Sequence, residues 1–117
     1  DEIFVIDSLT YAGNLSNLKD LINNSKVSFI KGDINDRQFL ESYIREKKIN
    51  CILNFAAESH VDRSIKTPNI FIKTNIEGAM NLVDIAIDRG VKKIVALSTD
   101  KACSPSNLYG ATKLIFI

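Results

Sequence analysis

Short apolar runs alternate with helical patterns along this chain, and this alternation is the feature that most constrains its fold. Four runs rich in isoleucine, valine and phenylalanine are expected to be strands buried on both faces, at residues 3–6, 27–30, 51–55 and 93–97. Helical patterns lie between them at about 15–23, about 36–48 and about 68–89. Strand–helix–strand repetition implies right-handed crossovers between parallel strands. The sequence therefore predicts an α/β fold with a doubly wound parallel sheet.

The helix expected at about 68–89 has the clearest boundary signals. Thr67 is expected to cap it, Pro68 suits the first helical position, and Gly90 suits a left-handed stop. Apolar residues occur almost all round it: Ile70, Phe71, Ile76, Met80, Val83 and Ile87. We therefore expect this helix to bury two faces, one against the sheet and one against a partner.

Length and composition limit the chain to one core and to few kinds of partner. The 117 residues suffice for one hydrophobic core but not for two domains. The net charge of +1 comes from 15 basic and 14 acidic residues mixed along the chain, so no nucleic acid partner is expected. No apolar run is long enough to span a bilayer and no signal peptide opens the chain, so no membrane partner is expected. Cys51 and Cys103 match no metal-ligand spacing, and we expect a cytoplasmic protein with reduced thiols and no metal.

Small or polar residues follow every expected strand, at 7–10, 32–34, 56–59 and 98–101. Ligands of doubly wound sheets bind beyond the carboxyl ends of the strands. The pattern therefore predicts a cofactor crevice at these four segments.

Asp7, at the end of the first strand, indicates a dinucleotide site. Its carboxylate can accept hydrogen bonds from both ribose hydroxyls of adenosine and would repel a 2′-phosphate, which favours NAD over NADP; a turn cap is the alternative. Asp33 could meet the adenine amino group while Ile34 packs on the ring. The small Ala56 and Ala57 let backbone approach a pyrophosphate, or serve only a tight turn. The glycine-rich phosphate loop would precede Asp7 by about 20 residues, so we expect it before residue 1.

Tyr109 and Lys113 are four residues apart and would share one face of a helix. A cation beside the phenol, together with a positively charged nicotinamide, stabilises its ionised form, so Tyr109 could take a proton from an alcohol. Lys113 could also hold the nicotinamide ribose. Thr99 lies at a strand tip ten residues before Tyr109, and its hydroxyl can bind the same substrate oxygen. These residues predict one catalytic crevice.

The segments LTYAGN (residues 9–14) and NFAAESHVDRSI (residues 54–65) resemble dTDP-glucose 4,6-dehydratases, members of the extended short-chain dehydrogenase/reductase superfamily. The resemblance covers essentially the whole chain and implies a Rossmann-like NAD-binding domain. It assigns to the NAD site Asp7, Ser8, Thr10, Asp33, Ile34, Phe55, Ala56, Ala57, Thr74, Tyr109 and Lys113. It assigns to the reacting sugar Ser59, Thr99, Asp100, Tyr109 and Lys113.

The sequence departs from this family around Thr99. The dTDP-glucose enzymes have an Asp-Glu pair after the threonine and a longer stretch before the tyrosine. Here LSTDKACSPSNLYGATK (residues 97–113) is similar to UDP-N-acetylglucosamine 4,6-dehydratases of polysaccharide and flagellin-glycan biosynthesis. The resemblance therefore leaves two substrates open, dTDP-glucose and UDP-N-acetylglucosamine.

The resemblance implies an internal redox cycle that yields a 4-keto-6-deoxy sugar nucleotide. Tyr109 would deprotonate the C4 hydroxyl, and Asp100 would protonate the departing C6 hydroxyl, which requires a neutral carboxyl that burial favours. Lys101 stands where the dTDP-glucose enzymes have a glutamate base. Like charge from Lys113 and the cofactor would favour a neutral amine that can remove the C5 proton. The alternative role of Lys101 is a salt bridge to Asp100.

Two alternative functions remain open on sequence alone, as do the roles of three further residues. A sugar-nucleotide 4-epimerase of the same superfamily would need Tyr109 and Lys113 but no acid–base pair after Thr99. A non-catalytic NAD-binding sensor or scaffold could share the fold. His60, Glu58 and Asp62 suit structural or capping roles as well as substrate contacts.

Both ends of the chain interrupt an expected element. We therefore expect residues 1–117 to be part of a single NAD-binding domain that lacks its first strand with the glycine-rich loop and the C-terminal substrate-binding part. The isolated fragment is expected to be inactive. The family also implies a homodimer of the full-length protein, formed through the helix at about 68–89 and the helix that starts near Leu108.

Overall fold

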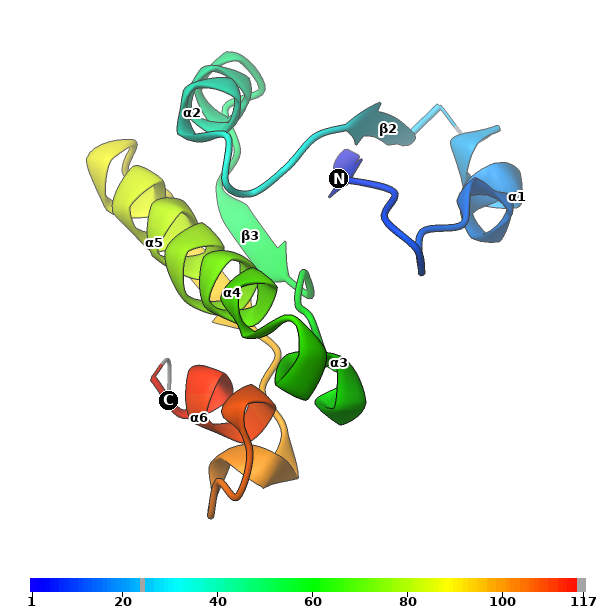
Figure 1. Ribbon diagram of the computed structural model, residues 1–117. Helices are drawn as coiled ribbons and strands as arrows, with labels where there is room; N and C mark the ends of the chain where they lie inside the picture. The colour runs from blue at the N-terminus through cyan, green and yellow to red at the C-terminus, as the bar shows by residue number, and fades with distance from the viewer. Residues whose placement is uncertain (24, 116–117) are drawn as a thin grey trace. The chain divides into compact units, whose positions relative to one another are not determined.

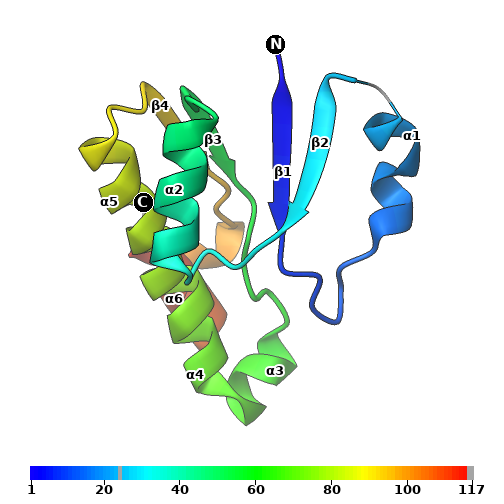
Figure 2. The same ribbon diagram turned by 90° about the horizontal axis from the view of Figure 1, so that it is seen from above.

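Two pairs of parallel strands, each with its own helices, make up the described part of the chain. The computed structural model describes residues 1–23 and 25–115 and divides into two units, Asp1–Asp33 and Ile34–Ile117. In each pair the two strands run in the same direction and a helical crossover joins them (Figures 1 and 2). The predicted α/β class with parallel strands is confirmed.

In the first unit, β1 (Ile3–Asp7) pairs with β2 (Val27–Lys31), in a register that runs from Ile3 opposite Val27 to Asp7 opposite Lys31. The crossover predicted as one helix at about 15–23 is a 3-10 turn, η1 (Leu15–Leu18), followed by one turn of α-helix, α1 (Lys19–Ile22). Asn14 begins it, because its Oδ1 accepts a 3.0 Å hydrogen bond from the Ser16 N–H.

The second unit begins with α2 (Arg37–Glu46), which leads to β3 (Cys51–Asn54). Helices α3 (Val61–Lys66), α4 (Pro68–Phe71), η2 (Ile72–Gly78) and α5 (Ala79–Asp88) then lead to β4 (Lys93–Ala96), parallel to β3. A 3-10 turn, η3 (Asp100–Ala102), and α6 (Leu108–Leu114) follow β4. Helix α3 and the turn η3 were not predicted.

The helix predicted at about 68–89 is present but is not a uniform α-helix. Its central part, η2, is π-helical, a rare form that is often found at functional sites. Pro68 occupies the first turn and Gly90 has a φ of +66°, so both boundary predictions are confirmed. Thr67 occupies the N-cap position as predicted, but its side chain makes no capping hydrogen bond, because its hydroxyl donates to the Arg63 carbonyl of α3 (3.1 Å).

Helices α2 and α5 pack together and lie against the β3–β4 pair (Figures 1 and 2). Leu40 and Ile44 of α2 and Leu82 and Ile85 of α5 are buried in this core.

Ion pairs also join the two helices α2 and α5. Arg37 reaches Asp84 (3.2 Å) and Asp88 (3.4 Å), and Arg89 pairs with Glu41. The hydrogen bond from Arg89 lowers the pKa of Glu41.

The prediction that the strands are buried on both faces is wrong for the chain described here. All four residues of β4 and both ends of β1 are exposed. Within residues 1–23 and 25–115, no helix is long and apolar enough to cross a bilayer.

Candidate active site

The segment after β4 and the helix α6 come together at one corner of the second unit. Lys113, on α6, donates a 2.8 Å hydrogen bond from Nζ to the carbonyl of Leu97, which follows β4. The Leu97 N–H in turn bonds the Asn54 carbonyl at the end of β3 (3.0 Å). Burial of the ammonium lowers the pKa of Lys113. A lysine thus lies at the carboxyl ends of both strands.

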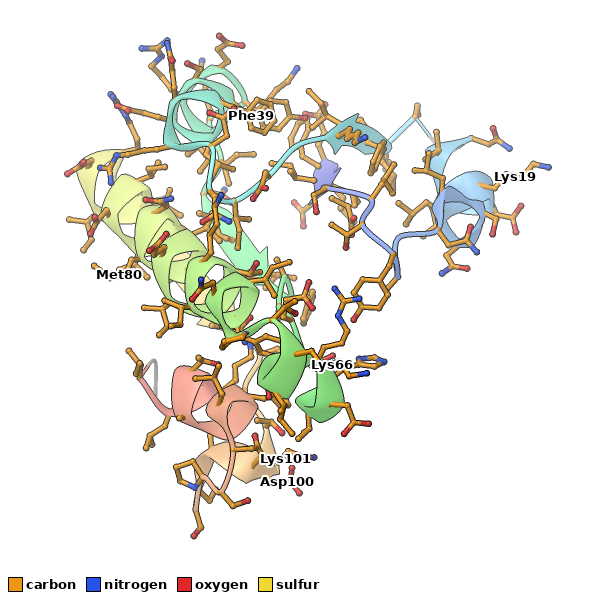
Figure 3. All side chains as sticks on the ribbon, viewed as in Figure 1. Lys19, Phe39, Lys66, Met80, Asp100 and Lys101 are labelled. Atoms are coloured by element: carbon orange, nitrogen blue, oxygen red, sulfur yellow. The ribbon has the colours of Figure 1, made fainter. Side chains whose placement is uncertain are left out.

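The turn η3 follows directly and, with Thr99 as its N-cap, carries three of the expected catalytic residues, Thr99, Asp100 and Lys101. Thr99 begins it, with its Oγ1 accepting from the Lys101 N–H (3.4 Å) and donating to Asp100 Oδ1 (3.1 Å). Lys101 Nζ lies 3.9 Å from the Asp100 carboxylate, so the salt bridge left open by the sequence is present. The expected burial of Asp100 is wrong for this chain, because its side chain is 92% exposed. Figure 3 shows Asp100 and Lys101 beside α6.

Close backbone contact fixes α6 against η3. A Cβ on Gly110 would lie 2.4 Å from the Lys101 carbonyl oxygen, so only glycine permits this approach. Asn107 caps α6 by accepting from the Gly110 N–H (2.9 Å). Tyr109, half-buried in the first turn, is therefore held next to the segment that carries Thr99 and Asp100.

A buried polar network, which the sequence did not reveal, joins the segment after β3 to α6. Asn75, in the π-helical turn, accepts from the Glu58 N–H (2.8 Å) and donates to the Glu58 carbonyl (2.9 Å) and to Thr112 Oγ1 (3.0 Å). Thr112 donates to the Tyr109 carbonyl (2.8 Å). Asn75, Glu58 and Thr112 are each at least 95% buried. The network spans three elements that carry candidate site residues.

The segment after β3 turns sharply because Asn54 Oδ1 accepts from the Ala56 N–H (3.1 Å). Phe55, Ala56 and Ser59 are exposed along it, and Ala57 is half-buried. Glu58 instead points inward, with Oε2 3.7 Å from Arg63 Nε. Of the two roles that the sequence left open for Glu58, this geometry favours the structural one.

The candidate cofactor residues divide between the two units. Ile34, Phe55, Ala56, Ala57 and Thr74 belong to the second, while Asp7, Ser8, Thr10 and Asp33 belong to the first. Asp7 Oδ1 accepts from the Leu9 N–H (2.6 Å), so the turn role considered for Asp7 is observed. The residue is exposed, which leaves the carboxylate accessible to a ligand as well. Among the described residues, no group of three or more histidine, cysteine or acidic residues could hold a metal ion.

Comparison with known proteins places this geometry in a family. The polysaccharide biosynthesis protein family matches residues 4–116, nearly the whole chain. The chain belongs to this family. Among similar proteins, the UDP-N-acetylglucosamine 4,6-dehydratase (inverting) of Campylobacter jejuni is 42% identical to this chain over 97 residues, which cover 83% of this chain and 28% of that protein.

Solved structures agree with this family assignment. The dTDP-glucose 4,6-dehydratase DesIV of Streptomyces venezuelae, solved with NAD and TYD bound, is 38% identical with a TM-score of 0.92 over 97% of this chain and 39% of its own. A UDP-Glc/GlcNAc 4-epimerase of Campylobacter jejuni is 26% identical, with a TM-score of 0.89 over 97% of this chain and 39% of its own. The predicted Rossmann-like fold and the resemblance to 4,6-dehydratases are therefore confirmed. The family member described here spans less than half of the relatives' length, from 24% to 40% for the curated proteins.

Proposed function

We propose that these residues form the NAD-binding part of a nucleotide-sugar 4,6-dehydratase, which converts dTDP-glucose or UDP-N-acetylglucosamine into its 4-keto-6-deoxy derivative. The contact between Lys113 and the Leu97 carbonyl carries this proposal, because it holds the Tyr109 helix at the tip of β4, beside Thr99. The relatives named as 4,6-dehydratases support the same reaction type.

NAD is proposed as the cofactor, with Asp7 favouring it over NADP. The exposed Asp7 carboxylate and the exposed Ala56 after the Asn54 turn fit a ribose and a pyrophosphate, respectively. The other residues proposed for this site are Ser8, Thr10, Asp33, Ile34, Phe55, Ala57 and Thr74, with Tyr109 and Lys113 at the nicotinamide end. When bound, NAD supplies a hydride acceptor for C4 and a donor for C6.

The residues of this chain supply the proton transfers. Tyr109 takes the proton of the C4 hydroxyl while the Thr99 hydroxyl binds the same oxygen, and Ser59 contacts the sugar. The resulting ketone acidifies the C5 proton, which Lys101 removes. Asp100 then protonates the departing C6 hydroxyl. Since Asp100 is exposed here, we propose that the rest of the full-length protein and the substrate cover it.

An exposed apolar face on the helix 68–88 supports a homodimer. Ile72, Met80 and Ile87 are 39%, 50% and 73% exposed although they are large and apolar. We propose that a second copy covers this face in a cytoplasmic full-length protein, and light scattering of that protein would give its oligomeric state.

The deciding experiment is to incubate the full-length protein with NAD and, separately, with dTDP-glucose and UDP-N-acetylglucosamine. Loss of water to give a keto product, detected by mass spectrometry and NMR, is the expected result with one of the two substrates. Formation of the C4 epimer alone would instead identify the protein as a 4-epimerase, since a solved 4-epimerase has the same fold as this chain. NAD binding without turnover of either sugar nucleotide would assign a sensor or scaffold.

A further inference from the structure

Ile34 packs against a helix position that has no side chain. A Cβ on Gly78 would lie 2.5 Å from Ile34 Cδ1 and 2.6 Å from Ile34 Cγ1, far inside van der Waals contact. Rotation of the terminal methyl alone could not relieve this overlap, because Cγ1 is also involved and the χ1 angle of a β-branched residue is restricted. Gly78 therefore fixes where the Ile34 side chain lies.

The backbone of the same segment is held on the same helix. Asn81, one turn after Gly78, donates from Nδ2 to the Ile34 carbonyl (3.3 Å). Arg37, three residues after Ile34, pairs with Asp84 of α5 at 3.2 Å. Ile34 itself is only half-buried, so part of its surface stays available for a ligand while the rest lies on the helix.

We propose that Gly78 and Asn81 are positioning residues for adenine recognition, since they fix the surface that Ile34 presents to the adenine ring of the cofactor. This inference rests on the proposed function, in which Ile34 contacts adenine. Neither residue needs to touch the cofactor. They act through Ile34, so a change at either should weaken binding of the adenosine half and leave the nicotinamide half unaffected.

The test measures Kd values of the full-length protein for ADP-ribose and for nicotinamide mononucleotide, which carry the two halves of NAD. Gly78→Ala is expected to weaken ADP-ribose binding about 10-fold, since overpacking displaces Ile34, with mononucleotide binding unchanged. In an Ile34→Ala background, which removes both Cγ1 and Cδ1, Gly78→Ala should cause no further loss of ADP-ribose affinity. Asn81→Ala tests the backbone contact if Gly78→Ala does not fold, and Glu77→Ala, an exposed position on the same helix, is the control.

The outcomes separate this inference from the function on which it rests. Selective loss of ADP-ribose affinity in Gly78→Ala, with no further loss when the same change is made in the Ile34→Ala background, supports it. Unchanged ADP-ribose affinity in the folded variants overturns it, and so does an equal loss of affinity for both ligands. In either case the proposed function still stands if the unaltered protein binds NAD. If the unaltered protein binds neither NAD nor ADP-ribose, the proposed function fails and this inference fails with it.

Discussion

The ammonium of Lys113 is hydrogen-bonded to the backbone carbonyl of Leu97 at 2.8 Å, which ties the last turn of α6 to the residue that follows β4. The two residues are sixteen positions apart, and the bond between them explains how the strand tip and the helix form one corner. It also gives Lys113 a structural role in addition to the proposed catalytic one. Each of these roles makes a separate prediction.

The structural role of Lys113 predicts a pH dependence of stability. Burial lowers its folded-state pKa below the ordinary value of 10.5, so between these two values the unfolded chain binds more protons and stability rises with pH. The cost of burying the charged ammonium reduces the free energy of unfolding below the folded-state pKa, and this cost is relieved as pH rises towards 10.5. Urea denaturation of the unaltered protein and of Lys113→Met at several pH values would measure it. A difference between the two unfolding free energies that does not change between neutral pH and 10.5 would contradict this account.

Replacement of Tyr109 by phenylalanine tests the proposed base. We expect kcat for dehydration to fall by about 10²–10⁴-fold, since a positioned general base contributes on this order. Affinity for NAD and the free energy of unfolding should stay close to those of the unaltered protein. Tyr43→Phe is the matched control, because Tyr43 stacks on Phe39 in α2, outside the proposed site. Retention of full dehydratase activity in Tyr109→Phe would remove the phenol from the mechanism.

Lys101→Met separates the first step from elimination. If Lys101 removes the C5 proton, the variant should still oxidise C4, seen as absorbance of the reduced cofactor, but should neither exchange the C5 proton with deuterium oxide nor release product. Lys66→Met, an exposed lysine at the end of α3, serves as the control. Normal C5 exchange in Lys101→Met would assign Lys101 only its observed contact with Asp100.

Asn75→Ala should destabilise the second unit strongly. It removes three hydrogen bonds and leaves the Glu58 backbone groups buried without their partner, which we expect to cost about 2–4 kcal/mol of unfolding free energy. Chemical denaturation gives this value. For comparison, Arg37→Ala breaks exposed ion pairs and should cost about 1 kcal/mol or less. An equal effect of the two substitutions would show that the Asn75 network contributes little.

Gly110→Ala tests the contact between α6 and η3. The added methyl would meet the Lys101 carbonyl, a backbone atom that cannot rotate away, so we expect a loss of about 1–3 kcal/mol in stability. Because the turn that carries Thr99 must then shift, kcat should fall as well. Asn69→Ala, at an exposed position of α4 outside the proposed site, is the control, since it leaves this contact intact. Wild-type stability and kcat in Gly110→Ala would mean that the two elements can separate freely.

The sequence predicts the four strands of this protein well because each is a short apolar run with a polar tip. The 93–97 run, for example, matches β4 to within one residue. The burial of the same strands was mispredicted, since exposure depends on which segments cover a sheet and not on the strand's own composition. The predicted burial of Asp100 is wrong for the same reason, because no local sequence pattern indicates which segments cover a side chain.

The buried network and the π-helical turn escaped prediction for another reason. Asn75 and Thr112 are 37 residues apart, and neither an asparagine in a helix nor a threonine before a lysine indicates its partner. Thr67 shows the local version of this limit: its hydroxyl could cap the next helix or bond back to Arg63, and the tertiary arrangement selects the second.

The π-helical turn also restricts how the chain can vary in length at this point. A π-helix holds one residue more between hydrogen-bonded groups than an α-helix, so a single deletion within Ile72–Gly78 could be absorbed as ordinary α-helix without breaking the chain. Because the wide turn would then become an ordinary one, the helical residues on its two sides would keep nearly their present faces. A deletion in α5 would instead turn the residues beyond it by about 100°. A one-residue gap in homologues is therefore expected at this stretch rather than in α5.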